Sequence, residues 1–77
     1  SVRLCEVDHH PGWVGRRLSA VERTTGARVA FVTRFGTAEL PTPETVLQDG
    51  DILHVLARTL DLVEVERILT HAPEQED

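Results

Sequence analysis

The side chains best suited to bind a metal ion gather near the start of the sequence. His9 and His10 are adjacent, and Cys5, Asp8 and His54 could be placed around the same ion. Adjacent residues rarely aim both imidazoles at one metal, and the sequence has neither an H-x-x-x-H nor a C-x-x-C spacing. The spacing therefore argues against a metal site, which a metal titration would test.

No group of residues has the spacing expected of a catalytic site. A nucleophile needs a base and an orienting group, and Ser19, Cys5 and the histidines show no recognised arrangement of this kind. The phosphate-binding pattern G-x-G-x-x-G is also absent, so we expect no NAD site in this chain. The sequence predicts a binding module and not an enzyme, with no cofactor of its own.

Size and composition fit one small folded domain. The 77 residues are 40% hydrophobic and 27% charged, which is the balance of a globular protein and not of a disordered segment. Below about 80 residues, a single core rarely supplies more than roughly 3–5 kcal/mol of stability. Dimerisation would help such a chain considerably, and we predict a homodimer.

Net charge and cysteine content limit the classes of binding partner and the cellular compartment that we expect for this chain. The net charge of −5 disfavours nucleic acid polymers, whereas a small anionic ligand needs only one or two local cations. The single cysteine cannot form an internal disulfide, which fits a reducing cytoplasm. No apolar run approaches the roughly 18 residues of a membrane helix, so we expect no direct membrane insertion. Because the chain begins without methionine on a strand-like run, we also expect a domain excised from a longer protein.

Hydrophobic periodicity predicts the elements that must position any site. They are a strand over 2–7, a helix from 13 that ends at 26, a strand over 28–35, a short extended segment over 37–40, a strand over 52–57 and a helix over 59–72. Gly50 permits the positive φ of a tight turn, and Pro41 and Pro43 restrict the segment before it to an edge. This order predicts an α+β fold class, a small sheet flanked by two helices. We divide the chain into a domain over 1–72 and an acidic tail over 73–77.

The final helix is expected to carry one apolar stripe and two apolar residues outside it. The stripe consists of Leu62, Val65, Ile68, Leu69 and Ala72. Leu60 and Val63 fall off this stripe, and they either pack on a neighbouring loop or meet a second chain. His54 lies within an apolar strand, so we expect it to be partly buried or at an interface, where its titration could tune a dimer.

One continuous run resembles the signature of a known family. Residues 41–55, PTPETVLQDGDILHV, are similar to the RCK_C domain, also called TrkA-C, the C-terminal regulatory domain of bacterial potassium-transport regulators. In that family a proline-bearing strand end leads into a hydrophobic pair, a glycine-aspartate turn and an apolar strand. Residues 14–18 resemble the start of the family's first helix, and 29–36 resemble its second strand. The resemblance spans 2–69.

The resemblance implies both an assembly and a role. It implies a dimer-forming regulatory domain in the cytoplasm, attached to or partnered with a membrane potassium channel or a cation/proton antiporter subunit. Several relatives bind cyclic di-AMP, a small nucleotide effector, in the cleft between two such domains. Two hypotheses stay open: a ligand-sensing domain that controls potassium or cation transport, and a ligand-free dimerisation module.

Candidate ligand residues follow from the same resemblance. Arg34 matches the family position whose arginine approaches a phosphate of the cyclic dinucleotide, and a guanidinium suits that contact by bidentate bonding. The apolar floor for the purine rings would be formed by Val29, Phe31, Leu40 and Pro41. Both assignments have an alternative, because Arg34 could be a solvated strand-end residue and the other four could be plain core. Glu39 opposes the ligand hypothesis, because an acid facing the phosphates would repel them.

Overall fold

The computed structural model describes residues 1–74 and has an α+β fold. Its elements are, in order, β1 (Val2–Val7), the 3₁₀ turn η1 (Pro11–Trp13), α1 (Leu18–Thr25), β2 (Arg28–Arg34), β3 (Thr37–Glu39), β4 (Ile52–Arg58), the 3₁₀ turn η2 (Thr59–Asp61) and α2 (Leu62–Thr70). The predicted fold class and the predicted order of elements are confirmed. Residues 75–77 of the predicted acidic tail lie outside the described residues.

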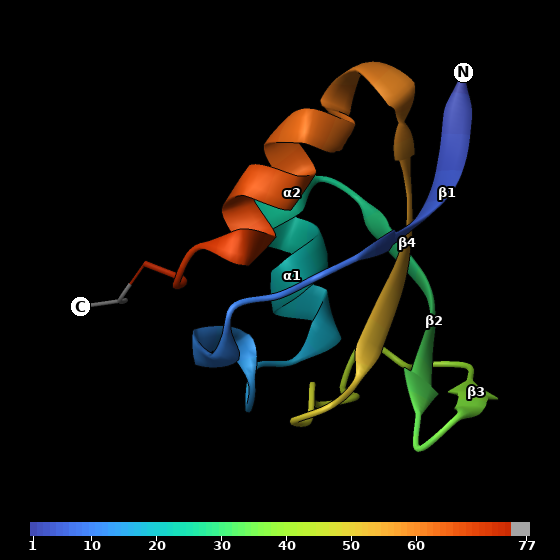
Figure 1. Cartoon of the computed structure of the whole chain (residues 1–77), viewed down its shortest axis with the longest axis vertical. Helices are drawn as coiled ribbons and strands as arrows, with labels where there is room; N and C mark the ends of the chain where they lie inside the picture. The colour runs from blue at the N-terminus through green and yellow to red at the C-terminus, as the bar shows by residue number, and fades with distance from the viewer. Residues whose placement is uncertain (75–77) are drawn as a thin grey trace.

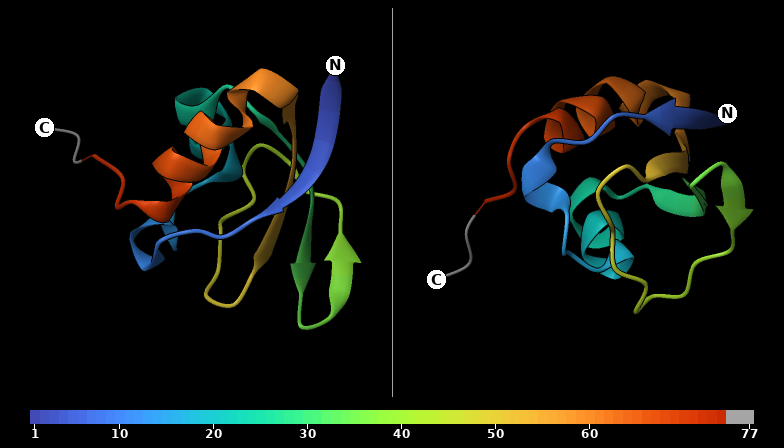
Figure 2. Two further views of the ribbon diagram at one scale, coloured as in Figure 1. Left: turned by 45° about the horizontal axis from the view of Figure 1, so that its top comes forward. Right: turned by 60° about the horizontal axis from the view of Figure 1, so that its bottom comes forward.

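The four strands form one antiparallel sheet in the order β1-β4-β2-β3. The last strand in the sequence, β4, therefore lies between β1 and β2 (Figure 1). Both helices lie on the same side of this sheet, and the loop between β3 and β4 runs back past the start of α1 (Figure 2). Within residues 1–74, the opposite face of the sheet is not covered by any element.

The core lies between the helices and the covered face of the sheet. The buried side chains of the helices are Leu18 and Val21 of α1 and Leu62, Val65 and Leu69 of α2. Those of the strands are Val7, Val29, Val32, Leu53, Val55 and Ala57. Trp13 and Leu47 belong to the segments that connect these elements, and their side chains complete the core. They are 2% and 0% exposed. Leu60 and Val63 are strongly exposed, which confirms that they lie outside the stripe of the final helix.

A β-bulge in β2 decides which of its side chains reach the core. The register against β4 shifts between Val29 and Phe31. Val29 and Val32 are consequently buried, three residues apart, while Phe31 lies on the uncovered face of the sheet, next to His54 of β4. A regular strand would have placed Val29 and Phe31 on the same face.

Two glycines occupy the positions predicted for them. Gly26 ends α1 with a φ of 75°, and its amide donates to the carbonyl of Glu22 at 2.8 Å. Gly50 has a φ of 84° in the turn before β4. Left-handed backbone of this kind is readily adopted by glycine and is strained for a β-branched residue.

The first helix begins later than predicted, at Leu18 and not at Trp13. The segment between them forms a turn at Val14 and Gly15 and then hydrogen-bonds to the loop before β4. The amide of Gly15 donates to the carbonyl of Leu47 at 2.8 Å, and that of Leu18 donates to the carbonyl of Thr45 at 2.8 Å. These bonds connect residues far apart in the sequence, so periodicity near Trp13 could not predict them.

The final helix is also shorter than the predicted range of 59–72. Its first turn is the separate 3₁₀ turn η2, and α2 ends at Thr70. The hydroxyl of Thr59 donates to the carbonyl of Ser1 at 3.3 Å and does not cap the helix. Ala72, the last residue of the predicted stripe, lies beyond the helix and is exposed. Neither helix within residues 1–74 is long and apolar enough to cross a membrane.

Candidate functional site

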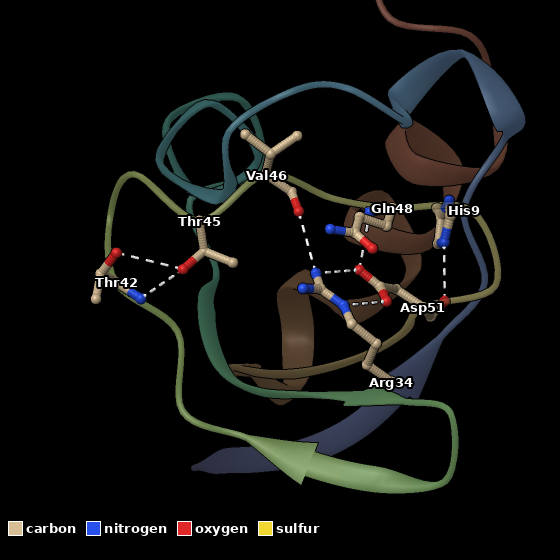
Figure 3. Close-up of polar contacts among 7 residues, drawn as sticks. All are labelled: His9, Arg34, Thr42, Thr45, Val46, Gln48 and Asp51. Atoms are coloured by element: carbon tan, nitrogen blue, oxygen red, sulfur yellow. Dashed lines mark hydrogen bonds and ion pairs between the residues drawn. The ribbon is translucent and has the colours of Figure 1, made fainter.

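Arg34, the residue expected to reach a phosphate, lies at the end of β2 and points toward the turn before β4 (Figure 3). Its Nε donates to Oδ1 of Asp51 at 2.9 Å, and its Nη2 donates to Oδ2 at 2.8 Å. A planar guanidinium and a carboxylate form this two-bond arrangement with defined geometry. Arg34 is therefore anchored within its own chain without any ligand.

Asp51 is the buried partner of this ion pair. Its side chain is 0% exposed, whereas that of Arg34 is 20% exposed. Oδ2 of Asp51 also accepts a hydrogen bond from the amide of Gln48 at 2.8 Å, within the turn before β4. The hydrogen bonds from Arg34 lower the pKa of Asp51, burial opposes this shift, and the Gln48 amide adds to it. Asp51 is thus a fixed negative charge beneath Arg34 at neutral pH.

Arg34 also fastens the loop between β3 and β4. Its Nη2 donates to the carbonyl of Val46 at 3.1 Å. The same loop is closed by Thr45, whose hydroxyl accepts from the amide of Thr42 at 2.8 Å (Figure 3). An isolated β-bridge between Arg17 and Val46 ties the loop to the segment before α1. One guanidinium therefore connects the end of β2, this loop and the start of β4.

One nitrogen of Arg34 is left to contact a ligand. Nε and Nη2 are engaged, and Nη1 has no hydrogen-bond partner within residues 1–74. Nη1 carries two of the five N–H donors of a guanidinium. The bonds to Asp51 raise the pKa of Arg34, and the charge of Glu39 on β3 adds a smaller increase. Glu39 thus lies within electrostatic reach of Arg34, and it would also act on an anion bound there.

The four apolar candidates do not form one surface within a single chain. Val29 is buried and, together with Pro41, lines a small cavity of about 150 Å³. Phe31 lies on the uncovered face of the sheet, where its ring stacks on that of His54 with centroids 4.0 Å apart. Leu40 follows β3 and is 88% exposed. Of the four, the fold brings Val29 and Pro41 together, and it leaves Leu40 facing solvent.

The histidines considered for a metal site each bond to a neighbouring group of the protein. Nε2 of His9 bonds with the carbonyl of Asp51 at 3.0 Å, and Nδ1 of His10 accepts from a backbone amide two residues later at 2.9 Å. Nε2 of His54 pairs with the hydroxyl of Thr33 at 2.9 Å, and His54 is half-buried, as predicted. Within residues 1–74, no three His, Cys, Asp or Glu side chains are grouped so that they could hold a metal.

Comparison with known families gives a match over nearly the whole chain. The TrkA-C domain matches residues 2–70, from the start of β1 to the end of α2. This chain belongs to the TrkA-C domain family. The resemblance drawn from residues 41–55 is thereby confirmed. The family consists of regulatory domains and not of enzymes, in agreement with the expectation for this chain.

A sequence relative of this TrkA-C domain is the Trk system potassium uptake protein TrkA of Streptomyces coelicolor. The two are 48% identical over 75 residues. The match covers 97% of this chain and 34% of the relative. The TrkA-C domain described here therefore spans about one third of that protein.

Two solved structures share the fold of this TrkA-C domain. One is the RCK C domain of the potassium transport protein KtrA in complex with cyclic di-AMP, with a TM-score of 0.74, 20% identity and coverage of 87% of this chain and 82% of that chain. The other is the RCK_C domain dimer of S. agalactiae BusR in complex with cyclic di-AMP, with a TM-score of 0.67, 18% identity and coverage of 90% and 88%. At these identities, the likeness shows that the fold is shared.

The partner of Arg34 in this TrkA-C domain was not predicted from the sequence. The two residues of the pair are 17 positions apart. Sheet register explains the contact, because Thr33 of β2 pairs with Ile52 of β4 in antiparallel fashion. The next residue of β2 therefore lies beside the residue that precedes β4. The sequence did contain a signal for this pair, namely an arginine at the end of one predicted strand and an aspartate just before another.

Proposed function

We propose that this TrkA-C domain senses a small nucleotide for a potassium uptake system, and that the ligand is cyclic di-AMP bound between two copies of the domain. Its relative TrkA is a potassium uptake protein, and the RCK_C domains of KtrA and BusR are in complex with cyclic di-AMP. The proposal places the domain in the cytoplasm, at a membrane potassium channel or a cation/proton antiporter subunit. Ligand occupancy would then change how the two copies sit against each other.

The observation that carries the proposal is the pair of exposed apolar side chains at the two ends of β3, one of which directly follows Arg34. Phe35 and Leu40, on either side of β3, are 94% and 88% exposed. Phe35 also has a φ of 51°, which is uncommon for an aromatic residue. Covering a large apolar side chain contributes roughly 1.5–3 kcal/mol. Exposed apolar side chains on both sides of β3, together with the cation of Arg34 on the neighbouring strand, suit a ligand that has both aromatic rings and phosphates.

A ligand with two-fold symmetry fits two copies of this surface. Each copy would present the same residues, so every favourable contact would be made twice. Nη1 of Arg34 would meet a phosphate while Asp51 holds the guanidinium in place, which reduces the ordering that binding requires. Leu40 and Pro41 would flank the bases, with Val29 beneath Pro41 at the shared cavity. Phe31 would contribute where the second copy reaches the uncovered face of the sheet.

A ligand-free dimerisation module is the second candidate, because the uncovered face of the sheet carries several exposed apolar side chains. Its exposed apolar side chains are Val2, Leu4, Ile52 and Leu56. Leu4 and Leu56 are paired across β1 and β4, and the stacked rings of Phe31 and His54 lie on the same face. A second copy placed over this face would enlarge a core that is marginal in a chain of this length.

Calorimetry and sedimentation on the same samples distinguish the two candidates. The first predicts binding of one cyclic di-AMP per dimer at tens of micromolar, in preference to other cyclic dinucleotides and to adenine nucleotides. A dimer that binds none of these compounds would support the dimerisation module. A monomer at high micromolar concentration that binds none of them would contradict both.

A pair of variants localises the ligand surface. Leu40→Ser should weaken cyclic di-AMP binding, because Leu40 lies in the proposed site. Leu60→Ser is the matched control, because Leu60 is 77% exposed and belongs to η2, far from Arg34 in the sequence. Equal affinities for the two variants would contradict the assignment of the site to the β2–β3 region.

A further inference from the structure

A groove of about 430 Å³ lies between α1 and α2, apart from the region around Arg34. Ligand sites in proteins typically have volumes of about 300–1,000 Å³. The volume of this groove lies within that range. The groove is lined from α1 and the segment before it by Arg16, Ala20 and Arg23, and from α2 by Arg67 and Ile68. None of these side chains is used in the proposed nucleotide site.

The charge of this groove is opposite to that of the chain. Three of the eight arginines line it, and of the thirteen acidic residues only Glu74 does so among residues 1–74. Arg67 is paired with Glu64 on its own helix. Arg16 and Arg23 form no ion pair within residues 1–74. The groove is therefore a local cationic surface in a protein whose net charge is −5.

Arg16 and Arg23 stand at opposite ends of the groove. The indole Nε1 of Trp13 donates to the carbonyl of His71 at 2.8 Å, so the chain entering α1 lies beside the chain leaving α2. Arg16 is consequently at the His71 end, and Arg23, in the last turn of α1, is at the other end. Arg16 lies two residues before α1 and Arg23 lies in its last turn, so most of the length of α1 separates the two arginines. Ala20 lies between them.

We propose that this groove binds an acidic peptide segment of a partner protein, in which apolar side chains lie between carboxylates. The apolar side chains would rest on Ala20 and Ile68, and the carboxylates would meet Arg16 and Arg23. An extended peptide advances about 3.4 Å per residue, so carboxylates spaced a few residues apart can reach arginines at the two ends of the groove. A single small anion could reach one end of the groove but not both.

The test uses the full chain and a defined peptide. The probe is acetyl-Glu-Glu-Leu-Leu-Glu-Glu-amide, and its control is the same peptide with glutamine in place of every glutamate. Trp13 is the only tryptophan of the chain and lines the groove, so its fluorescence and its indole N–H resonance report on binding. Sub-millimolar binding of the acidic peptide, weakening with added salt, is expected.

Variants of neighbouring arginines locate the contact. Arg16→Gln and Arg23→Gln should each weaken binding about three- to five-fold, as expected for partly exposed ion pairs. Arg17→Gln is the matched control, because Arg17 is adjacent to Arg16 and exposed but does not line the groove. Circular dichroism checks each fold, and if Arg16→Gln does not fold, Arg23→Gln carries the comparison.

Four results would overturn the proposal. They are equal binding of the glutamine peptide, equal weakening by Arg17→Gln, displacement of the peptide by equimolar inorganic pyrophosphate, and binding of the peptide only to a chain shortened to end at Glu74. The last result would identify the acidic end of this chain as the occupant. No cyclic dinucleotide is used, so failure of the proposed nucleotide function leaves this test unaffected.

Discussion

Replacing Arg34 by alanine should destabilise the domain even when no ligand is present. The substitution removes two of the three hydrogen bonds to the carboxylate of Asp51 and leaves that of Gln48. Removing one partner of a buried ion pair costs about 3–5 kcal/mol. Because the Arg34 side chain is 20% exposed, water can partly replace it, and we expect a loss of about 2–3 kcal/mol. The core of a chain of this length rarely supplies more than roughly 3–5 kcal/mol, so the effect should be large.

Urea unfolding followed by Trp13 fluorescence measures this loss. A double-mutant cycle with Arg34→Ala, Asp51→Ala and the combined variant isolates the pair, and its coupling energy should be at least about 1.5 kcal/mol. Arg28→Ala, on the same strand and exposed, is the matched control and should change the free energy of unfolding by less than about 0.5 kcal/mol. Additive effects in the cycle, or an Arg34→Ala variant as mild as Arg28→Ala, would refute the structural role of the pair.

The pH dependence of the unfolding free energy tests the same ion pair. The pKa of Asp51 is lowered in the folded domain, so its carboxylate stabilises the fold above the unfolded pKa of about 3.9. This contribution is lost as the pH falls below that value toward the folded pKa. Unfolding free energies at about pH 6 and about pH 3 should therefore differ more for the wild type than for Asp51→Asn. The same difference in both proteins would show that other carboxylates govern the acid sensitivity.

The remaining predictions concern the turn and the ligand surface. Gly50→Val should lower the unfolding free energy by about 1–2 kcal/mol, because a β-branched residue is strained at the φ of 84° found there; an unchanged melting temperature would contradict the turn. Leu40→Ser should weaken cyclic di-AMP binding in calorimetry while leaving the melting temperature unchanged, since Leu40 is 88% exposed. Glu39→Gln should strengthen that binding, because it removes a negative charge near Arg34; weaker binding would show that the acid helps the ligand.

The elements of the fold were predictable wherever the decisive interactions are local. Strand β1 was predicted with the bounds that the structure has, and Gly26 and Gly50 were assigned their positions from the backbone freedom of glycine. The start of α1 was not predictable in this way. It depends on the hydrogen bonds that Gly15 and Leu18 make to a loop about 30 residues later in the sequence. Periodicity is read in windows of about 11–18 residues and cannot detect contacts over that separation.

The site was predictable in part for the same reason. Arg34 was identified through the family resemblance, but its pairing with Asp51 depends on the register between β2 and β4. The β-bulge that places Phe31 and Val29 on opposite faces of the sheet is also a feature of the pairing between β2 and β4. The sequence shows which residue types are present, whereas their grouping in space depends on pairings between strands.

The pair formed by Arg34 and Asp51 bears on the way in which a phosphate would be bound. The charge of the guanidinium is already balanced by a buried carboxylate, so Nη1 offers directed hydrogen bonds more than a net positive charge. Affinity for cyclic di-AMP should then depend weakly on salt concentration. The groove between the helices differs, because Arg16 and Arg23 form no ion pair within residues 1–74 and should attract carboxylates in a salt-sensitive manner. Calorimetry at low and high ionic strength therefore separates the two surfaces, and a steep salt dependence of cyclic di-AMP binding would mean that Asp51 does not neutralise Arg34 in the complex.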